Sequence, residues 1–279
     1  MNYITVGKEN SCNIDLYYED MGEGQPVVLI HGWPLSSRSW ERQVPALLKA
    51  GFRVIAYDRR GFGQSSRPGS GYDYDTLADD LHALMTRLDL RKAVLVGFSM
   101  GGGEVAHYLG RYGTERVQKA VFMAAVTPFL RKAADNAAGL DAGIFEEIKQ
   151  AIRADRPSFL TSFLSNFYNV HAFGGKKVSE ELLRLSWSIA AAASPIGTLA
   201  CVDSWLTDFR DDLVRIRIPT LVMHGDDDRI LPFAATGSRT HEAVEGSRLI
   251  VVAGAPHGLN WTHAEEVNDG LIDFMQEAI

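Results

Sequence analysis

The sequence has 279 residues, of which 46% are hydrophobic and 23% are charged. This length and composition allow a core large enough for an α/β enzyme, in one large domain or two small ones. The formal net charge is −7 and no cluster of Lys and Arg accompanies it, so we expect no nucleic-acid partner.

The two cysteines, Cys12 and Cys201, lie far apart and lack the spacing of a metal site. We therefore expect neither a disulfide framework nor a metal centre, and a reducing cytoplasm fits this usage. Residues 1–6 lack the basic and apolar regions of a signal peptide, and no apolar run is long enough to span a bilayer. The protein is accordingly predicted to be cytoplasmic, with no membrane partner.

Short apolar runs alternate with helical patterns along most of the chain. The runs predict strands over residues 14–19, 27–30, 53–57, 93–96, 120–126, 220–223 and 249–252. Between them, helices are predicted over residues 39–50, 74–88, 103–112, 234–244 and 263–277. Such an alternation is typical of βαβ units and predicts an α/β fold with a mostly parallel sheet.

The alternation stops between residues 128 and 217, where Ala, Phe and Leu recur at helical spacing. We interpret this stretch as a helical lid, inserted into a core made of residues 1–127 and 218–279. Because open α/β sheets bind ligands at the carboxyl ends of their strands, the lid is expected to cover that edge. Its aromatic residues either line the underside of the lid or pack it; they are Phe129, Phe159, Phe163, Phe167, Tyr168, Trp187 and Trp205. The substrate pocket is expected to include Trp33, Phe129, Trp205 and Ile230.

Residues Gly97 to Gly101 form a G-x-S-x-G pattern, directly after the apolar run 93–96 and before a predicted helix. In this setting the pattern predicts a nucleophile elbow, whose central serine stands at the carboxyl edge of the sheet. The neighbouring glycines allow the sharp turn and let the helix start close to the strand. We therefore predict that Ser99 is a catalytic nucleophile rather than a structural turn serine.

A serine nucleophile needs a base, and the base needs an acid that fixes its tautomer. In the chain order Ser, acid, His, the acid is expected in the turn after strand 220–223, where three aspartates stand side by side. Asp228 is favoured because it directly precedes the segment Arg229-Ile230-Leu231-Pro232. Asp227 is the alternative.

The base is expected in the loop after the last predicted strand, where His257 follows Pro256. His263, at the start of the last predicted helix, is the rival candidate, but a loop position suits a mobile base better. His31 and His224 are interpreted as structural. The remaining histidines lie on predicted helices or in the lid without expected chemical partners and are also interpreted as structural: His82, His107, His171 and His241.

The run His31-Gly32-Trp33-Pro34 directly follows the buried strand 27–30. An HG dipeptide in this position turns the chain so that the next backbone N–H points at the nucleophile. The backbone N–H groups of Trp33 and Met100 are therefore predicted to form an oxyanion hole, in which each donor lowers the barrier by about 3 kcal/mol. Neither a phosphate-binding G-x-x-x-x-G-K-S/T motif nor an H-E-x-x-H zinc motif occurs, and Gly61-Phe62-Gly63 lacks the third glycine of a dinucleotide site.

Four segments together resemble one branch of the α/β-hydrolase superfamily, the cofactor-free bacterial haloperoxidases with related perhydrolases, aryl esterases and γ-lactamases. The segments are residues 31–34, residues 57–66 (Tyr-Asp-Arg-Arg-Gly-Phe-Gly-Gln-Ser-Ser), residues 97–103 and residues 255–263 (Ala-Pro-His-Gly-Leu-Asn-Trp-Thr-His). The resemblance covers nearly the whole chain and is weakest in the lid. It implies an α/β-hydrolase fold with a mostly parallel eight-stranded sheet flanked by helices, a helical cap and no cofactor.

The resemblance also implies a mechanism, with Ser99, Asp228 and His257 as a triad. Ser99 would be acylated by a small ester, amide or carboxylic acid, and water would release the acid. Hydrogen peroxide in place of water would release a peracid, which oxidises halide in solution without a halide site. The Trp33-Pro34 pair is similar to the perhydrolase version of the loop. Homo-oligomers also occur in the family, and the sequence leaves the oligomeric state of this chain open.

Other functions stay open at this stage. A γ-lactamase or amidase would use the same triad and differ only in the shape of the pocket. A non-catalytic ligand-binding protein on the same fold is disfavoured, because such proteins often lose a triad member. A dehalogenase or epoxide hydrolase would need an aspartate where Ser99 stands.

Overall fold

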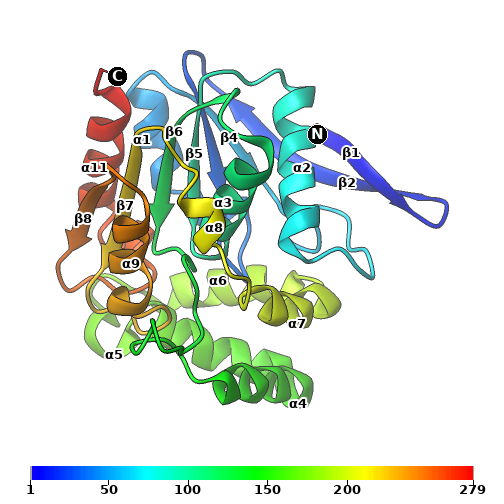
Figure 1. Cartoon of the computed structure of the whole chain (residues 1–279). Coiled ribbons are helices and arrows are strands. Elements are labelled where there is room, and N and C mark those ends of the chain that lie inside the picture. The colour runs from blue at the N-terminus through cyan, green and yellow to red at the C-terminus, as the bar shows by residue number, and fades with distance from the viewer. Residues whose placement is uncertain (1, 279) are drawn as a thin grey trace.

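The computed structural model describes residues 2–278 and is built around one eight-stranded sheet (Figure 1). The strands are β1 (Asn2–Glu9), β2 (Cys12–Met21), β3 (Pro26–Ile30), β4 (Arg53–Tyr57), β5 (Ala93–Phe98), β6 (Val117–Met123), β7 (Thr220–Gly225) and β8 (Arg248–Val252). Their spatial order is β1-β2-β4-β3-β5-β6-β7-β8. β2 runs antiparallel to both of its neighbours, and the other neighbouring pairs are parallel. The predicted mostly parallel eight-stranded sheet is confirmed.

The central and edge strands differ in burial. Every residue of β5 is buried, because parallel strands are covered by helices on both faces, and its sequence is therefore apolar without alternation. In β1, at the edge of the sheet, Ile4 is the one buried residue. This strand has no continuous apolar run, which is why the sequence alone does not predict it.

Helices cover both faces of the sheet (Figure 1). On one face α1 (Gln43–Lys49) packs against α11 (Ala264–Gln276). On the other face lie α2 (Tyr74–Arg87), α3 (Met100–Tyr112), α8 (Arg210–Leu213) and α9 (Gly237–Ala243). Shorter elements are η1 (Ser37–Trp40), η2 (Phe233–Ala235) and α10 (Leu259–Thr262).

Some element boundaries differ from the predicted ones. Residues 39–50 do not form one helix, since η1 ends at Trp40 and α1 begins at Gln43. β6 spans Val117–Met123 rather than 120–126. α3 begins at Met100 rather than at residue 103, so the glycines of the elbow lie inside its first turn. A Cβ atom at Gly101 would lie 2.3 Å from the Ile30 carbonyl oxygen, so glycine here lets the helix start close to the sheet.

The lid stretch, residues 128–217, contains helices and none of the eight strands. Its helices are α4 (Ala142–Phe167), α5 (Val170–Phe173), α6 (Glu180–Ala192), α7 (Pro195–Ser204) and α8. The first four lie together at one end of the sheet, at the bottom of Figure 1. α4 is broken at Asp155, whose side chain caps the second half by accepting the Ser158 N–H at 2.9 Å.

Within residues 2–278, no single helix is long and apolar enough to cross a membrane. α6 and α7 meet the length and composition criteria only as a pair, and the chain bends by 92° between them.

Candidate active site

Ser99 stands in the turn between β5 and α3. Its backbone has a φ of 55° and a ψ of −119°, which residues other than glycine rarely adopt. Two backbone hydrogen bonds hold this turn: the Ser99 N–H donates to Met123 O at 2.9 Å, and Ser99 O accepts the Val126 N–H at 3.2 Å. A Cβ atom at Gly97 would lie 2.4 Å from the Gly101 carbonyl oxygen, so a larger residue would not fit.

Ser99, His257 and Asp228 form a chain of hydrogen bonds. Ser99 Oγ lies 2.9 Å from His257 Nε2, and His257 Nδ1 lies 2.7 Å from Asp228 Oδ2. The three residues follow β5, β8 and β7, whose carboxyl ends meet at the same edge of the sheet. His257 is fully buried and Ser99 is 6% exposed. This geometry lets a histidine take a proton from a serine while a carboxylate fixes the tautomer of the ring.

Asp228 is held in its ionised form by its surroundings. Its second oxygen, Oδ1, accepts the backbone N–H groups of Ile230 and Leu231, each at 2.8 Å. Burial raises the pKa of the Asp228 carboxyl, but His257 and His224 outweigh this effect and hold that pKa well below its usual range. Asp228 therefore carries a negative charge at neutral pH.

The two neighbouring aspartates face other partners. Asp227 Oδ2 accepts from Asn169 Nδ2 at 2.7 Å, and Asp226 Oδ1 accepts the backbone N–H of Gly254. Of the three aspartates, Asp228 is the one whose carboxylate contacts the imidazole. The alternative acid, Asp227, lies beside the site without joining the chain of hydrogen bonds.

His224, interpreted from the sequence as structural, contacts the acid directly. Its Nε2 lies 2.9 Å from Leu231 O and 3.1 Å from Asp228 Oδ2. Because a carbonyl oxygen only accepts, Nε2 carries the proton and donates toward both oxygens. Its place at the end of β7, shortly before the acid, is the sequence signal that could have indicated this contact.

The loop after β3 lies against the elbow. A Cβ atom at Gly32 would come within 2.9 Å of Ser99 Cβ, so glycine permits this close contact. His31 Nε2 accepts the Arg59 backbone N–H at 3.0 Å. The ring proton therefore sits on Nδ1, which donates to Gly32 O at 2.9 Å. Burial and the charge of Arg59 hold the pKa of His31 well below its usual range, so the ring stays neutral.

The hydrogen bond from His31 orients the expected oxyanion donor. The Gly32 carbonyl and the Trp33 N–H belong to one planar peptide unit, so fixing the carbonyl also fixes the direction of the N–H. The Leu35 N–H donates to the same oxygen at 3.1 Å. The second expected donor, Met100, is the first residue of α3, where N–H groups have no partner within the helix.

A buried ion pair connects this loop to α3. Arg59 Nε lies 2.8 Å from Glu104 Oε2, and Arg59 Nη2 donates to His31 O at 3.0 Å. The Tyr57 O–H donates to the other oxygen of Glu104. These side chains are at most 1% exposed. In the sequence, Arg59 belongs to the family signature at residues 57–66, and no local pattern pairs it with a glutamate on α3.

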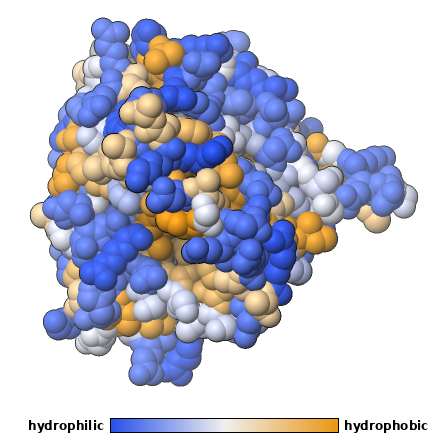
Figure 2. Space-filling view, turned by 60° about the horizontal axis from the view of Figure 1, so that its bottom comes forward, coloured by the Kyte–Doolittle hydropathy of each residue, from blue (hydrophilic) through white to orange (hydrophobic). Residues whose placement is uncertain are grey.

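A cavity of about 380 Å³ opens on Ser99 between the sheet and the lid. Its wall is mostly apolar and includes Trp33, Phe163, Trp205 and Ile230. The Trp33 ring packs edge-on against Phe163 and Trp205, with ring centroids 5.0 and 4.9 Å apart. On the face turned forward in Figure 2, hydrophobic residues gather in a hollow that hydrophilic residues surround.

Phe129 is not part of this wall, contrary to the prediction. Its ring packs under the guanidinium of Arg210, which lies 5.2 Å from the ring centroid, and Leu130 lines the cavity instead. Phe167, for which lining and packing were both expected, lies against the imidazole of His257 with ring centroids 5.0 Å apart. The helical spacing of the lid could not show which of its aromatic side chains line the cavity and which pack elsewhere.

Residues 25–264 match the family described as alpha/beta hydrolase fold. The chain belongs to the alpha/beta-hydrolase family. A Synechocystis protein provisionally named a non-heme chloroperoxidase is 59% identical to this hydrolase, over 99% of the chain and 100% of its own length.

Two further relatives of this alpha/beta hydrolase also carry names of perhydrolases or haloperoxidases. A bifunctional esterase/perhydrolase of Acinetobacter calcoaceticus is 38% identical, over 99% of this chain and 100% of its own length. A bromoperoxidase from Bacillus anthracis with a known crystal structure is 51% identical in sequence. The two structures superimpose over 99% of each chain with a TM-score of 0.94. The hydrolase therefore belongs to the non-heme haloperoxidase branch, as the sequence resemblance implied.

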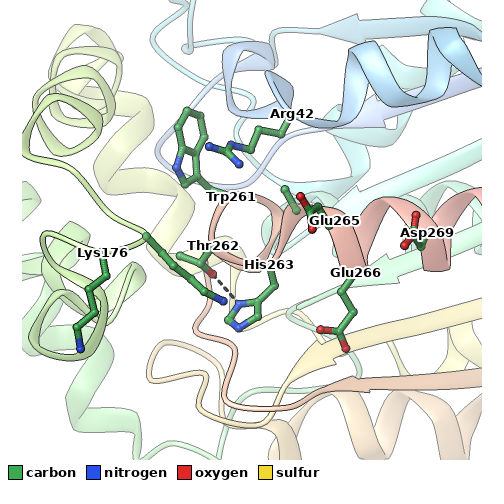
Figure 3. A pocket seen from close by; sticks show the side chains of 10 residues that line it. Arg42, Lys176, Trp261, Thr262, His263, Glu265, Glu266 and Asp269 are labelled. Carbon is green, nitrogen blue, oxygen red and sulfur yellow. Dashed lines mark hydrogen bonds between the residues drawn. The ribbon is translucent and has the colours of Figure 1, made fainter.

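The hydrolase has a second cavity, of about 690 Å³, whose wall does not include Ser99 (Figure 3). His263, the rival base, lies in this wall, and its Nδ1 is 2.9 Å from Thr262 Oγ1. Charges of both signs line the cavity: Arg42, Lys176, Lys177, Glu265, Glu266 and Asp269. Within residues 2–278, no group of three or more His, Cys, Asp or Glu side chains is arranged to hold a metal ion.

Of the four helix and lid histidines interpreted as structural, His107 has two carboxylate partners that were not expected from the sequence. Its Nδ1 lies 2.8 Å from Asp212 Oδ2 and its Nε2 lies 2.9 Å from Asp75 Oδ1. These carboxylates raise the pKa of His107 to about 9. The other three also have partners: His82 stacks on Tyr112, His171 lies 3.4 Å from Arg229, and His241 lies 2.8 Å from Ser247.

Proposed function

We propose that this alpha/beta hydrolase cleaves small carboxylic esters through an acyl-enzyme on Ser99, and that hydrogen peroxide competes with water to release a peracid. The observation that carries the proposal is the buried chain of hydrogen bonds from Ser99 to His257, at 2.9 Å, and from His257 to Asp228, at 2.7 Å. The names of the relatives support the same chemistry, since they include an esterase/perhydrolase and non-heme chloroperoxidases.

In the first half-reaction, His257 Nε2 accepts the hydroxyl proton as Ser99 Oγ attacks the ester carbonyl carbon. Asp228 accepts the hydrogen bond from Nδ1 and stabilises the imidazolium that forms. The backbone N–H groups of Trp33 and Met100 donate to the developing oxyanion, and each donor lowers the barrier by about 3 kcal/mol. His257 then gives its proton to the departing alcohol, and the acyl group stays on Ser99.

In the second half-reaction, His257 takes a proton from the attacking water, and the carboxylic acid leaves as Ser99 Oγ regains a proton. When hydrogen peroxide attacks the acyl carbon in place of water, the same proton transfers release a peracid. The peracid then transfers one oxygen atom to halide outside the site, with uptake of a proton, and gives hypohalous acid and the carboxylic acid. Halogenation by this route uses no redox cofactor and no halide site.

The cavity supports small substrates of apolar character. Its volume of about 380 Å³ and its aromatic wall suit short or medium acyl and alcohol groups. Phe167 packs against the His257 ring, with ring centroids 5.0 Å apart. Esters, and carboxylic acids when peroxide is present, are therefore the acyl donors that we expect.

The test is turnover of p-nitrophenyl acetate by the wild type and by Ser99→Ala, each with and without hydrogen peroxide. Ser99→Ala should lose about a thousandfold or more in kcat, and only the wild type should form peracid. Equal turnover by both proteins would contradict the role of Ser99. Hydrolysis by the wild type without any peracid would remove the perhydrolase half of the proposal.

A further inference from the structure

We propose that this hydrolase prefers esters that carry a carboxylate away from the scissile bond, and that Arg229 binds this carboxylate. The inference rests on the proposed ester chemistry at Ser99 and adds the class of substrate. It follows from the composition of the cavity, from the contacts of Arg229 and from its position next to the acid.

The cavity that opens on Ser99 has one formally charged residue in its wall. Most of its lining residues are apolar or aromatic, and the polar ones are Ser99, Ser162, Asn166 and Arg229. An apolar cavity with one cationic group suits a substrate with an apolar stem and one anionic end. The cavity in Figure 3 differs in this respect, because cations and anions are mixed along its wall.

The ion pair of Arg229 is loose compared with the structural ion pairs of the core. Arg229 Nε lies 3.6 Å from Asp227 Oδ1, and each of the two side chains is 46% exposed. In the buried pair of Arg60 and Asp80, by contrast, two hydrogen bonds of 2.6 Å join the groups. A half-exposed ion pair at such a distance contributes little free energy to stability. A substrate carboxylate can therefore displace Asp227 from the guanidinium or bind beside it.

Asp227 is also engaged from its other side. Its Oδ2 accepts from Asn169 Nδ2 at 2.7 Å. Arg229 Nη1 lies 3.4 Å from His171 Nδ1, a contact between two groups of which neither carries a negative charge. The negative charge next to the guanidinium is thus shared with an amide. A guanidinium with five N–H groups keeps the capacity to donate two parallel hydrogen bonds to a substrate carboxylate.

The position of Arg229 along the chain ties it to the catalytic geometry. It directly follows Asp228, whose Oδ1 accepts the N–H groups of Ile230 and Leu231. These hydrogen bonds fix the loop, and both residues line the same cavity as Ser99. The loop that holds the acid against His257 therefore also holds the cation at the wall of the substrate cavity.

The experiment measures a ratio of kcat/KM values for matched anionic and neutral esters. For a carboxylate on the acyl side, the pair is monomethyl adipate and methyl hexanoate. For a carboxylate on the alcohol side, the pair is 4-acetoxybenzoate and 4-methylphenyl acetate. The neutral ester of each pair is an internal reference, so a general loss of activity does not change the ratio.

In Arg229→Gln, the anionic-to-neutral ratio should fall about tenfold for one of the two pairs, and Arg229→Lys should restore part of it because the charge is kept. Asp227→Asn should raise the same ratio, since it removes the competing carboxylate. Added salt should lower the ratio in the wild type but not in Arg229→Gln. The pair that responds identifies the side of the ester that carries the carboxylate.

A ratio that is the same in the wild type and in Arg229→Gln for both pairs would overturn the inference. Calorimetric binding of monomethyl adipate and 4-acetoxybenzoate to Ser99→Ala, with and without Arg229→Gln, gives a readout that needs no turnover. Binding of one of them that weakens about tenfold without Arg229 supports the inference even if the proposed chemistry fails. Binding that is unaffected contradicts the inference even if the chemistry holds.

Discussion

The carboxyl edge of the sheet and the lid above it are stabilised by different kinds of contact. At the sheet edge, Asp228 and His31 are buried and bonded to backbone groups at 2.8–3.0 Å. On the lid side of the cavity, Phe163 and Trp205 meet Trp33 through ring contacts with centroids about 5 Å apart. Hydrogen bonds fix direction, whereas aromatic packing fixes mainly volume. We infer that the sheet edge determines the reaction, whereas the lid sets the size and shape of the substrate cavity.

The largest effect is expected at the acid of the sheet edge. Asp228→Asn removes the charge that fixes the His257 tautomer while it keeps the shape, so kcat for p-nitrophenyl acetate should fall about ten-thousandfold. The control is Asp226→Asn, because Asp226 accepts only from the Gly254 backbone N–H in the described contacts. If Asp228→Asn retained more than a tenth of the wild-type kcat, the role given to Asp228 would be wrong.

The next effect concerns the oxyanion loop. His31→Gln removes the Nδ1 donor that orients the Gly32–Trp33 peptide, so kcat should fall about ten- to a hundredfold with little change in KM. His31→Asn places an amide N–H near the position of Nδ1 and should recover part of the loss. Circular dichroism spectra and thermal unfolding of both variants show whether they fold alike. An increase in KM with unchanged kcat would mean that His31 supports ground-state binding instead.

A change in the lid should alter selectivity more than rate. Phe163→Ala enlarges the cavity beside Trp33, so the ratio of kcat/KM for p-nitrophenyl hexanoate over acetate should rise up to about tenfold. Trp187→Ala is the matched control, because Trp187 is a lid aromatic residue outside this cavity. Equal shifts of the ratio in the two variants would show that the lid acts as a whole and not through this cavity wall.

The smallest effect is expected where α8, the last helix of residues 128–217, packs against α3 on a face of the sheet. His107 on α3 contacts Asp212 on α8, and its pKa is raised from 6.5 to about 9 by Asp212 and Asp75. A raised pKa stabilises the folded state fully below about pH 6.5, and this contribution is lost as the pH rises through 9. His107→Gln should therefore lower Tm by about 2–4 °C at pH 6 and by less at pH 10.

The control for this prediction is His82→Gln on α2. The His82 ring stacks on Tyr112, and its hydrogen bond is to a hydroxyl group, Thr86 Oγ1. Its effect on Tm should be the same at both pH values. A pH-independent effect of His107→Gln would contradict the ionic contact with Asp212 and Asp75.

Local signals in the sequence were sufficient for the main residues of the candidate site. The serine, acid and base candidates each follow a strand of apolar residues, and parallel strands bring these positions to one edge of the sheet. The choice between Asp227 and Asp228 rested on the segment after them, and the contacts of Asp228 with His257 agree with the preferred residue. The catalytic roles themselves stay predictions for the experiments above.

Contacts between distant segments could not be predicted in the same way. The partners of His107 lie 105 and 32 residues away, and no local sequence pattern indicates that these carboxylates contact its ring. Glu104 sits on α3, whereas Arg59 follows β4, so their pairing depends on the fold. In the lid, helical spacing predicted that the aromatic residues lie on helices, but it did not indicate which of them face the cavity. Phe129 packs under Arg210 instead.

Both hydrolysis and perhydrolysis are proposed to proceed through Ser99. The most direct test is to react the protein with diethyl p-nitrophenyl phosphate and to map the adduct by mass spectrometry. We expect a single adduct on the peptide that contains Ser99, with parallel loss of ester hydrolysis and peracid formation. Peracid formation that survives in the fully labelled protein, or an adduct on another residue, would contradict this role of Ser99.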